Sequence, residues 1–257
     1  MVTTDVFLLI DDFLNFKKFK ENNNYVGTIF YGSYSNNLQN INSDIDLIIV
    51  FDKLDKQTKC YELYKGIVFE YYERSLDSLY ERIEHDIRNY NDSSLSIIGY
   101  GKIIGGDKYL KKLQQYTRNK FKKDWPRLMT NAELRYRLVN LHKNQNYLKR
   151  LYDDNDPYFN IFYAIVLDKI RLFYHETKGF SKIGTSKVFK IYSNKVIAKK
   201  QKRILPDDSF IDLFKRCVLT SDKEEKMVVI MNLYYSVIKS YKIDFNKVKI
   251  NLNGREY

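Results

Sequence analysis

Three carboxylates are spaced in a way that suits the chemistry of metal-bound phosphates. Asp44 and Asp46 lie two residues apart at the start of the apolar run 45–51. Residues two apart on a strand point to the same face, so both carboxylates can bind the same hard cations. Glu70 interrupts the apolar and aromatic run 67–72, where a charge needs a partner or a metal. These three residues are therefore our candidate magnesium ligands and catalytic residues.

A glycine–serine pair precedes the carboxylates. Gly32 and Ser33 directly follow the β-branched and aromatic run 25–31, and Ser33 lies eleven residues before Asp44. Where a strand gives way to a helix, free backbone N–H groups and the positive end of the helix dipole hold phosphate oxygens. We predict that this pair binds a nucleoside triphosphate. Ser43, the neighbour of Asp44, either helps to bind the cofactor by orienting that carboxylate or is a turn residue.

Together these groups could catalyse an in-line displacement at phosphorus. Two magnesium ions at the carboxylates would neutralise the triphosphate, lower the pKa of an acceptor hydroxyl and stabilise the leaving pyrophosphate. Each group alone has an ordinary explanation as a turn or as a solvated strand end. The combination favours function, because Asp46 lies inside an apolar strand where an unpaired carboxylate is costly.

In this combination the segment resembles the polymerase beta type nucleotidyltransferase superfamily. Its signature is a hydrophobic residue and Gly-Ser, then a spacer, then Asp-x-Asp on a strand with a later carboxylate. Gly32, Ser33, Asp44, Asp46 and Glu70 match this signature position by position. The resemblance implies magnesium-dependent transfer of a nucleoside monophosphate from a nucleoside triphosphate.

The resemblance is specific over about residues 25–115 and architectural beyond them. The layout is similar to that of the bacterial enzymes that adenylylate aminoglycosides and lincosamides. It therefore implies ATP as the donor, a small hydroxylated molecule as the acceptor and a role in antibiotic resistance. One departure is that residues 34–37 read Tyr-Ser-Asn-Asn, where many members carry a basic residue and a second glycine.

The elements that position these residues follow from hydrophobic spacing. A first helix should begin at the capping candidates Thr3 and Thr4 and continue to about Lys20. A helix capped by Ser75 should follow the strands. The other expected elements are strands at 25–31, 45–51 and 66–72, a short helix at 33–38 and an extended piece at 102–104.

The second half of the sequence is predicted to be mainly helical. Thr130 and Ser221 each begin a capping-box pattern, and the segment 159–174 is apolar on nearly every side, which is typical of a buried central helix. We therefore predict an α+β protein, with a nucleotidyltransferase core built on a mixed β-sheet and a helical acceptor-binding domain. The predicted domains are 1–124 and 125–257.

Two further acidic residues have competing interpretations. Glu73 is the rival of Glu70 as the third carboxylate, but it lies beyond the apolar run and should lie near solvent on the opposite face of the sheet. Glu176, near the end of the central helix, is either a general base or a solvated residue at a helix end. We favour Glu70 and the solvated interpretation.

Composition sets the cellular expectations. The chain has 257 residues, of which 44% are hydrophobic, and these are sufficient for packed cores. No signal peptide or membrane-spanning segment is expected, and Cys60 and Cys217 lack disulfide or zinc spacing. We therefore expect a cytoplasmic protein with no membrane partner.

Three functions from different classes remain open. The first is adenylylation of a small hydroxylated molecule. The second is nucleotide transfer to RNA, such as tRNA, or to a protein, as in toxin systems. The net charge of +12 favours a nucleic-acid partner modestly, because basic surfaces attract phosphates; a compositional bias of the chain explains this scattered charge at least as well. The third is a non-catalytic protein that binds a nucleotide or a partner, and the intact set of carboxylates argues against it.

Overall fold

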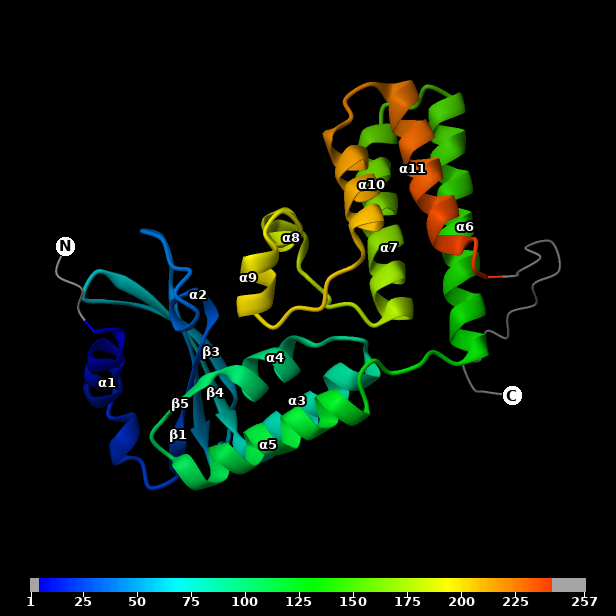
Figure 1. Cartoon of the computed structure of the whole chain (residues 1–257). Coiled ribbons are helices and arrows are strands. Elements are labelled where there is room, and N and C mark those ends of the chain that lie inside the picture. The colour runs from blue at the N-terminus through cyan, green and yellow to red at the C-terminus, as the bar shows by residue number, and fades with distance from the viewer. Residues whose placement is uncertain (1–4, 242–257) are drawn as a thin grey trace. The chain divides into compact units, whose positions relative to one another are not determined.

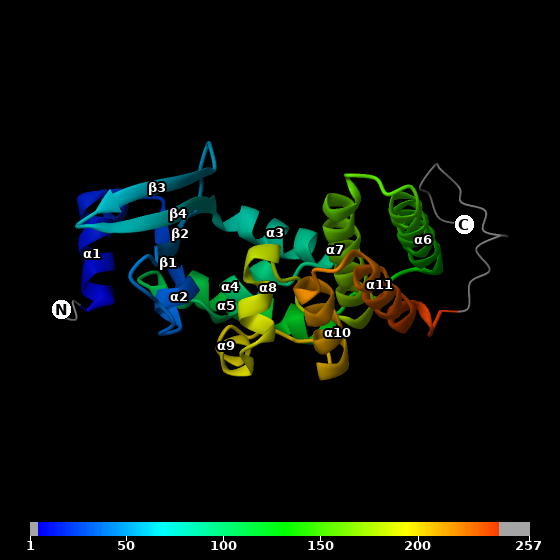
Figure 2. The same ribbon diagram turned by 90° about the horizontal axis from the view of Figure 1, so that it is seen from above.

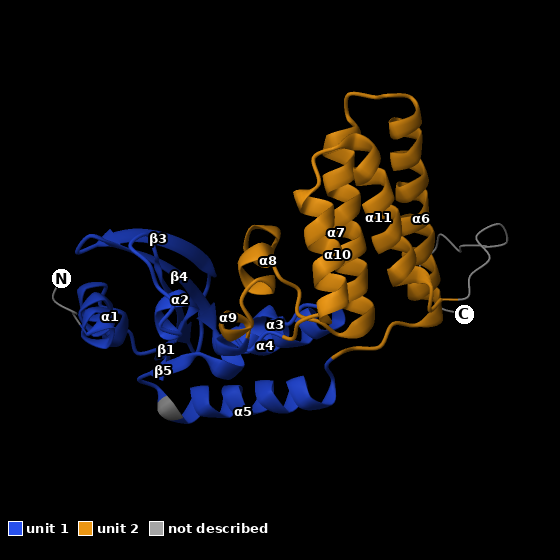
Figure 3. Ribbon diagram, turned by 45° about the horizontal axis from the view of Figure 1, so that its top comes forward, with its two compact units in different colours: residues 1–125, 199–203 blue, residues 126–198, 204–257 orange. Residues whose placement is uncertain are grey.

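The computed structural model describes residues 5–241, apart from the side chain of Asp107. It divides into two compact units, of residues 1–125 with 199–203 and of residues 126–198 with 204–257 (Figure 3). The short segment 199–203 thus lies within the mainly helical half of the sequence but packs with the first unit. Within the described range, no helix has the length and apolar character that a membrane crossing requires.

The first unit is built on a five-stranded mixed sheet with the order β3-β4-β2-β1-β5. Strand β2 pairs parallel with β4 and antiparallel with β1, and the β1–β5 and β3–β4 pairs are antiparallel. The predicted mixed sheet is thus confirmed. The strands are β1 (Tyr25–Tyr31), β2 (Ile45–Phe51), β3 (Thr58–Tyr64), β4 (Ile67–Ser75) and β5 (Lys102–Ile104).

Helices cover both sides of this sheet (Figure 1). Alternate residues of β2, among them Leu47 and Ile49, form one apolar core with α1 (Val6–Phe16). On the other side lie α3 (Leu76–Arg88), α4 (Ser93–Tyr100) and α5 (Asp107–Lys123) (Figure 2). Because side chains alternate along a strand, Asp46 belongs to the face opposite the α1 core.

The sequence misplaced some helix ends. Helix α1 ends at Phe16, and a short 3₁₀ turn at Phe19–Glu21 replaces its predicted last turn. The described cap of α1 is Asp5, whose carboxylate accepts from the Phe7 N–H; the predicted caps Thr3 and Thr4 lie outside the described residues. Ser75 does cap α3, as predicted, by accepting from the N–H of Ser78.

The second unit is helical (Figure 1). Its central helix α7 (Phe159–Lys178) buries residues on several sides, as its apolar sequence predicts, and α6 (Asn131–Asp153) begins with the predicted capping box of Thr130 and Glu133. At α11 (Lys223–Ile238) the cap is Asp222 rather than the predicted Ser221. The remaining helices are α8 (Thr185–Tyr192), α10 (Asp208–Leu219) and α9 (Lys195–Lys200), whose last two residues belong to the first unit.

His175 is a buried residue of α7 with two hydrogen-bond partners. Its Nδ1–H donates to the Ser181 carbonyl and its Nε2 accepts from the Tyr192 hydroxyl, an arrangement that needs the neutral ring. Burial, followed by the charge of Arg171, lowers the pKa of His175 to about 4. As the pH falls below about 6.5, the usual pKa of histidine, the unfolded chain therefore binds a proton at this residue before the folded chain does.

We predict that this histidine destabilises the protein between pH 6.5 and pH 4. The loss should reach about 3 kcal/mol of unfolding free energy at pH 4. Urea unfolding of the full chain at several pH values measures it. His175→Gln should flatten this part of the pH profile, whereas His85→Gln, at an exposed position, should not; equal profiles for all three proteins would contradict the prediction.

Candidate active site

The three predicted carboxylates lie together in the first unit. Asp44, Asp46 and Glu70 each offer an oxygen, and these oxygens all lie within 4.8 Å of one another. The strand register explains this proximity, because Asp46 pairs with Glu70 across the parallel β2–β4 ladder and Asp44 directly precedes β2. All three side chains are half-buried. Three hard oxygen donors at this spacing fit the magnesium ions that the sequence resemblance implies.

Gly32 lies against this cluster. It is the first residue of α2 (Gly32–Ser35), and its φ of +80° lies in the left-handed region that favours glycine. A Cβ added to Gly32 would lie 1.8 Å from Oδ2 of Asp46. Glycine is thus required by the backbone angle and by the close approach of the carboxylate.

Side chains of its own loop hold the glycine–serine turn. The Ser35 hydroxyl and the Asn36 amide both donate to the Gly32 carbonyl, at 3.0 and 2.7 Å. The helix that follows is shorter than predicted, since it ends at Ser35 instead of residue 38. Ser33 therefore lies in a single helical turn, directly beside the carboxylate-bearing strand.

Gly32→Ala tests the close approach to Asp46. The change should cost about 2 kcal/mol of folding stability through backbone strain and should lower kcat/KM by about 10² by displacing the carboxylate. Gly66→Ala is the matched control, because Gly66 has the same φ of +80° and nothing within 4 Å of an added Cβ. We expect the control to lose stability but keep its activity, as measured by urea unfolding and a transfer assay. Equal activity in both variants would show that the contact has no catalytic importance.

Two tyrosines border the carboxylates. Burial, and then the charge of Asp46, raise the pKa of Tyr31 well above its usual value, so its phenol stays protonated. The hydroxyl of Tyr72 donates to Oε1 of Glu70 at 3.2 Å. The site therefore supplies hydrogen-bond donors as well as carboxylates.

Tyr31 and Tyr72 also line a pocket of about 970 Å³ in the first unit. Ile48 and Arg74 line it from the sheet, at positions that follow Asp46 and Glu70 by two and four residues on the same strands. Residues of α3 and α4 form the other walls. Because residues two and four apart on a strand share a face, this pocket lies on the same face of the sheet as Asp46 and Glu70.

Ser43 makes the contacts of a turn residue. Its hydroxyl accepts from the Asn40 N–H at 2.8 Å and lies 3.3 Å from the Asn40 side-chain oxygen. These bonds fix the loop that leads into Asp44. The role of Ser43 in cofactor binding stays a prediction.

Lys59 is the residue of this site that the sequence analysis missed. Its Nζ lies 2.8 Å from Oε1 of Glu70, and this hydrogen bond is the main reason that the pKa of Lys59 is raised. Lys59 lies on β3, a strand that was not predicted. The available signal in the sequence was Gly66 after Lys65, because two-residue hairpin turns favour glycine; in the structure both residues have positive φ, as such a turn requires.

Glu176 has a different environment from the one predicted. Its side chain is buried rather than solvated, and it pairs with Arg137 and with Lys182. It also lines a groove between α6 and α7. The two basic partners compensate the cost of burying this carboxylate.

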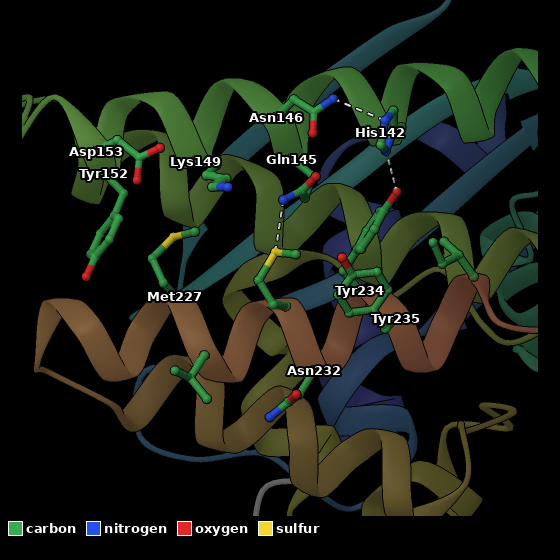
Figure 4. A pocket seen from close by; sticks show the side chains of 13 residues that line it. His142, Gln145, Asn146, Lys149, Tyr152, Asp153, Met227, Asn232, Tyr234 and Tyr235 are labelled. Carbon is green, nitrogen blue, oxygen red and sulfur yellow. Dashed lines mark hydrogen bonds between the residues drawn. The ribbon is translucent and has the colours of Figure 1, made fainter. Parts of the chain in front are cut away.

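A further groove of about 660 Å³ lies between α6 and α11 of the second unit (Figure 4). The Asn146 amide donates to Nε2 of His142, so Nδ1 of His142 donates to the Tyr234 hydroxyl. Among the described residues that line it, Asp153 is the only acidic one. These residues therefore do not include the paired carboxylates that a magnesium site needs.

The fold and the site define a class of enzyme. A mixed sheet carries three clustered carboxylates, and a glycine–serine turn lies against one of them. This is the arrangement of a nucleotidyltransferase. Residues 15–98 match the family model described as polymerase beta, nucleotidyltransferase. The matched segment contains Gly32, Ser33 and all three carboxylates, so the match and the site together support a nucleotidyltransferase of the polymerase beta type.

Comparisons with curated proteins and with solved structures add little about function. The chain has no match among curated proteins. Among solved structures it is similar to a nucleotidyltransferase-like protein from Exiguobacterium sibiricum 255-15, with 14% identity and a TM-score of 0.45 over 88% of this chain and 72% of that chain. A likeness this distant says nothing about the acceptor.

Proposed function

We propose that this protein uses magnesium to transfer a nucleoside monophosphate, AMP from ATP, to a hydroxyl of a small molecule. The observation that carries the proposal is the cluster of Asp44, Asp46 and Glu70 within 4.8 Å. In the reaction, the acceptor oxygen forms a bond to the α-phosphorus and the bond from that phosphorus to the bridging oxygen breaks. Pyrophosphate leaves, and the acceptor proton passes to solvent or a base.

Each residue of the site has a part in this scheme. Asp44, Asp46 and Glu70 would hold two magnesium ions, which supply charge neutralisation for the triphosphate and lower the pKa of the acceptor hydroxyl. Gly32 allows phosphate to approach the backbone, and Ser33 offers its hydroxyl and N–H. Tyr31, which stays protonated, can donate a hydrogen bond to a phosphate oxygen.

The pocket beside the carboxylates supports substrate binding there. Its apolar, tyrosine and arginine side chains suit an organic ligand that also carries polar groups. We assign the nucleotide to the first unit and, as expected for the antibiotic-modifying enzymes that the sequence resembles, the acceptor to the second predicted domain, residues 125–257.

Transfer to RNA or to a protein is the second candidate. The observation in its favour is the net charge of +12, which attracts polyanions. This positive charge would not favour the binding of a cationic aminoglycoside. A role in antibiotic resistance therefore depends on the identity of the acceptor.

One experiment separates these candidates. The purified protein is incubated with magnesium, α-labelled ATP and, in separate reactions, aminoglycosides, lincosamides, tRNA or cell protein. Label on an antibiotic supports the first candidate, and label on tRNA or protein supports the second. No release of pyrophosphate with any of the four nucleoside triphosphates and any acceptor pool would refute the proposal.

A further inference from the structure

Lys59 forms an ion pair with Glu70, the third carboxylate of the site. Its Nζ lies 2.8 Å from Oε1 of Glu70, and the Tyr72 hydroxyl donates to the same oxygen. In the β3–β4 ladder Lys59 pairs with Tyr72, and Tyr61 pairs with Glu70. Lys59 therefore projects from the carboxylate-bearing face of the sheet, two positions from the strand that carries Asp46.

Two aromatic rings hold the ammonium group where it is. Nζ of Lys59 lies 4.7 Å from the ring centre of Tyr61 and 5.2 Å from that of Tyr72. Cations are attracted to the faces of such rings. The lysine side chain is nevertheless 39% exposed, against 18% for Glu70, so the ammonium can leave the carboxylate without unpacking the core.

An ammonium and a magnesium ion are rivals for this carboxylate. Both are cations that bind the carboxylate oxygens of Glu70, and they repel each other at the short distances within the site. A metal that binds without nucleotide must do so against the charge of Lys59. A bound triphosphate lowers this repulsion, because its oxygens give Lys59 another anionic partner. Lysines commonly bind phosphate in proteins.

We propose that Lys59 makes metal binding depend on the nucleotide: it holds Glu70 before the nucleotide arrives and moves to a triphosphate oxygen when the metal and nucleotide bind. This inference rests on the proposed function. Lys59 is thus a positioning residue for Glu70 in the empty site and a phosphate ligand in the loaded one. By linkage, the metal and the nucleotide must each raise the affinity of the other.

The test measures metal affinity, not turnover. Mn²⁺ binding is followed by electron paramagnetic resonance, with and without the non-reacting analogue α,β-methylene-ATP. In the wild-type protein the analogue should tighten Mn²⁺ binding by about 10-fold or more. Lys59→Met should bind Mn²⁺ alone about 10-fold more tightly than the wild type, and should bind the analogue more weakly. Lys59→Arg, which keeps the charge, should restore weak binding of Mn²⁺ alone.

Lys17→Met is the matched control. Lys17 also pairs with a carboxylate of β3, Glu62, at 2.8 Å, and it too is part-exposed. Glu62 lies on the other face of the strand from Lys59, so this variant should leave both affinities unchanged. A folding loss common to both variants would be seen in their unfolding curves.

The outcomes separate the inference from the proposed function. Unchanged or weaker binding of Mn²⁺ alone by Lys59→Met overturns the role of Lys59, while the metal site of the proposed function stands. If the wild-type protein binds no Mn²⁺ with or without the analogue, the metal site itself is wrong and both fail. Opposite shifts in metal and analogue affinity, confined to Lys59→Met, support the inference.

Discussion

Asp46→Asn is expected to lower kcat/KM by about 10³ or more, because it removes negative charge from the site where magnesium and the transferred phosphoryl group meet. Asp46 lies at the centre of the arrangement. It pairs with Glu70 on one side and with Tyr31 on the other, and Gly32 lies against its carboxylate. The amide keeps the shape of the side chain, so the fold should survive.

The measurement is single-turnover transfer with saturating magnesium, beside a urea unfolding curve. Asp52→Asn is the control, because Asp52 is an exposed residue just beyond the same strand. It should react at the wild-type rate. An Asp46→Asn protein that turns over at a near wild-type rate would show that the cluster is not the metal site.

The sheet was predictable where its strands are buried. Strands β1 and β2 have the predicted bounds, because continuous β-branched and aromatic runs are typical of central strands. Asp46 was detectable for the same reason, since a carboxylate inside such a run is costly. The conformation of Gly32 and its contact with Asp46 needed the structure, because a sequence pattern gives no distances.

The edge of the sheet was not predictable in the same way. Strand β3 alternates half-buried and exposed residues, and its exposed positions carry Lys59, Tyr61 and Leu63. Such a mixture has no clear apolar face, so the strand and its lysine were missed. The helix cap at Asp222 shows a related limit: Ser221 and Asp222 are both good caps, and the local backbone turn decides between them.

The packing of segment 199–203 with the first unit depends on tertiary contacts. Its sequence is basic and polar and is not distinct from its neighbours. Arg203 nevertheless pairs with Asp92, a fully buried residue at the start of α4. A long-range ion pair of this kind has no local signal, so a single boundary near Trp125 was the natural prediction from sequence.

Glu70→Gln and Glu73→Gln, compared side by side, are expected to separate a metal ligand from a neighbour on the same strand. Glu70 pairs with Asp46 across the parallel ladder, whereas Glu73 pairs with Ile49. Residues three apart on a strand point to opposite faces, so only one of the two can reach the cluster. Both side chains are half-buried, which makes Glu73→Gln a closely matched control.

Glu70→Gln should lower kcat/KM by about 10² or more, since the amide removes a charged metal ligand and weakens the attraction of Lys59. Glu73→Gln should change the rate little. Transfer rates and Mn²⁺ affinities of both variants measure the difference, and unfolding curves correct for any common loss of stability. If Glu73→Gln proves the inactive variant, the third ligand lies on the opposite face, and Glu70 is held at the cluster only by its bond to Lys59.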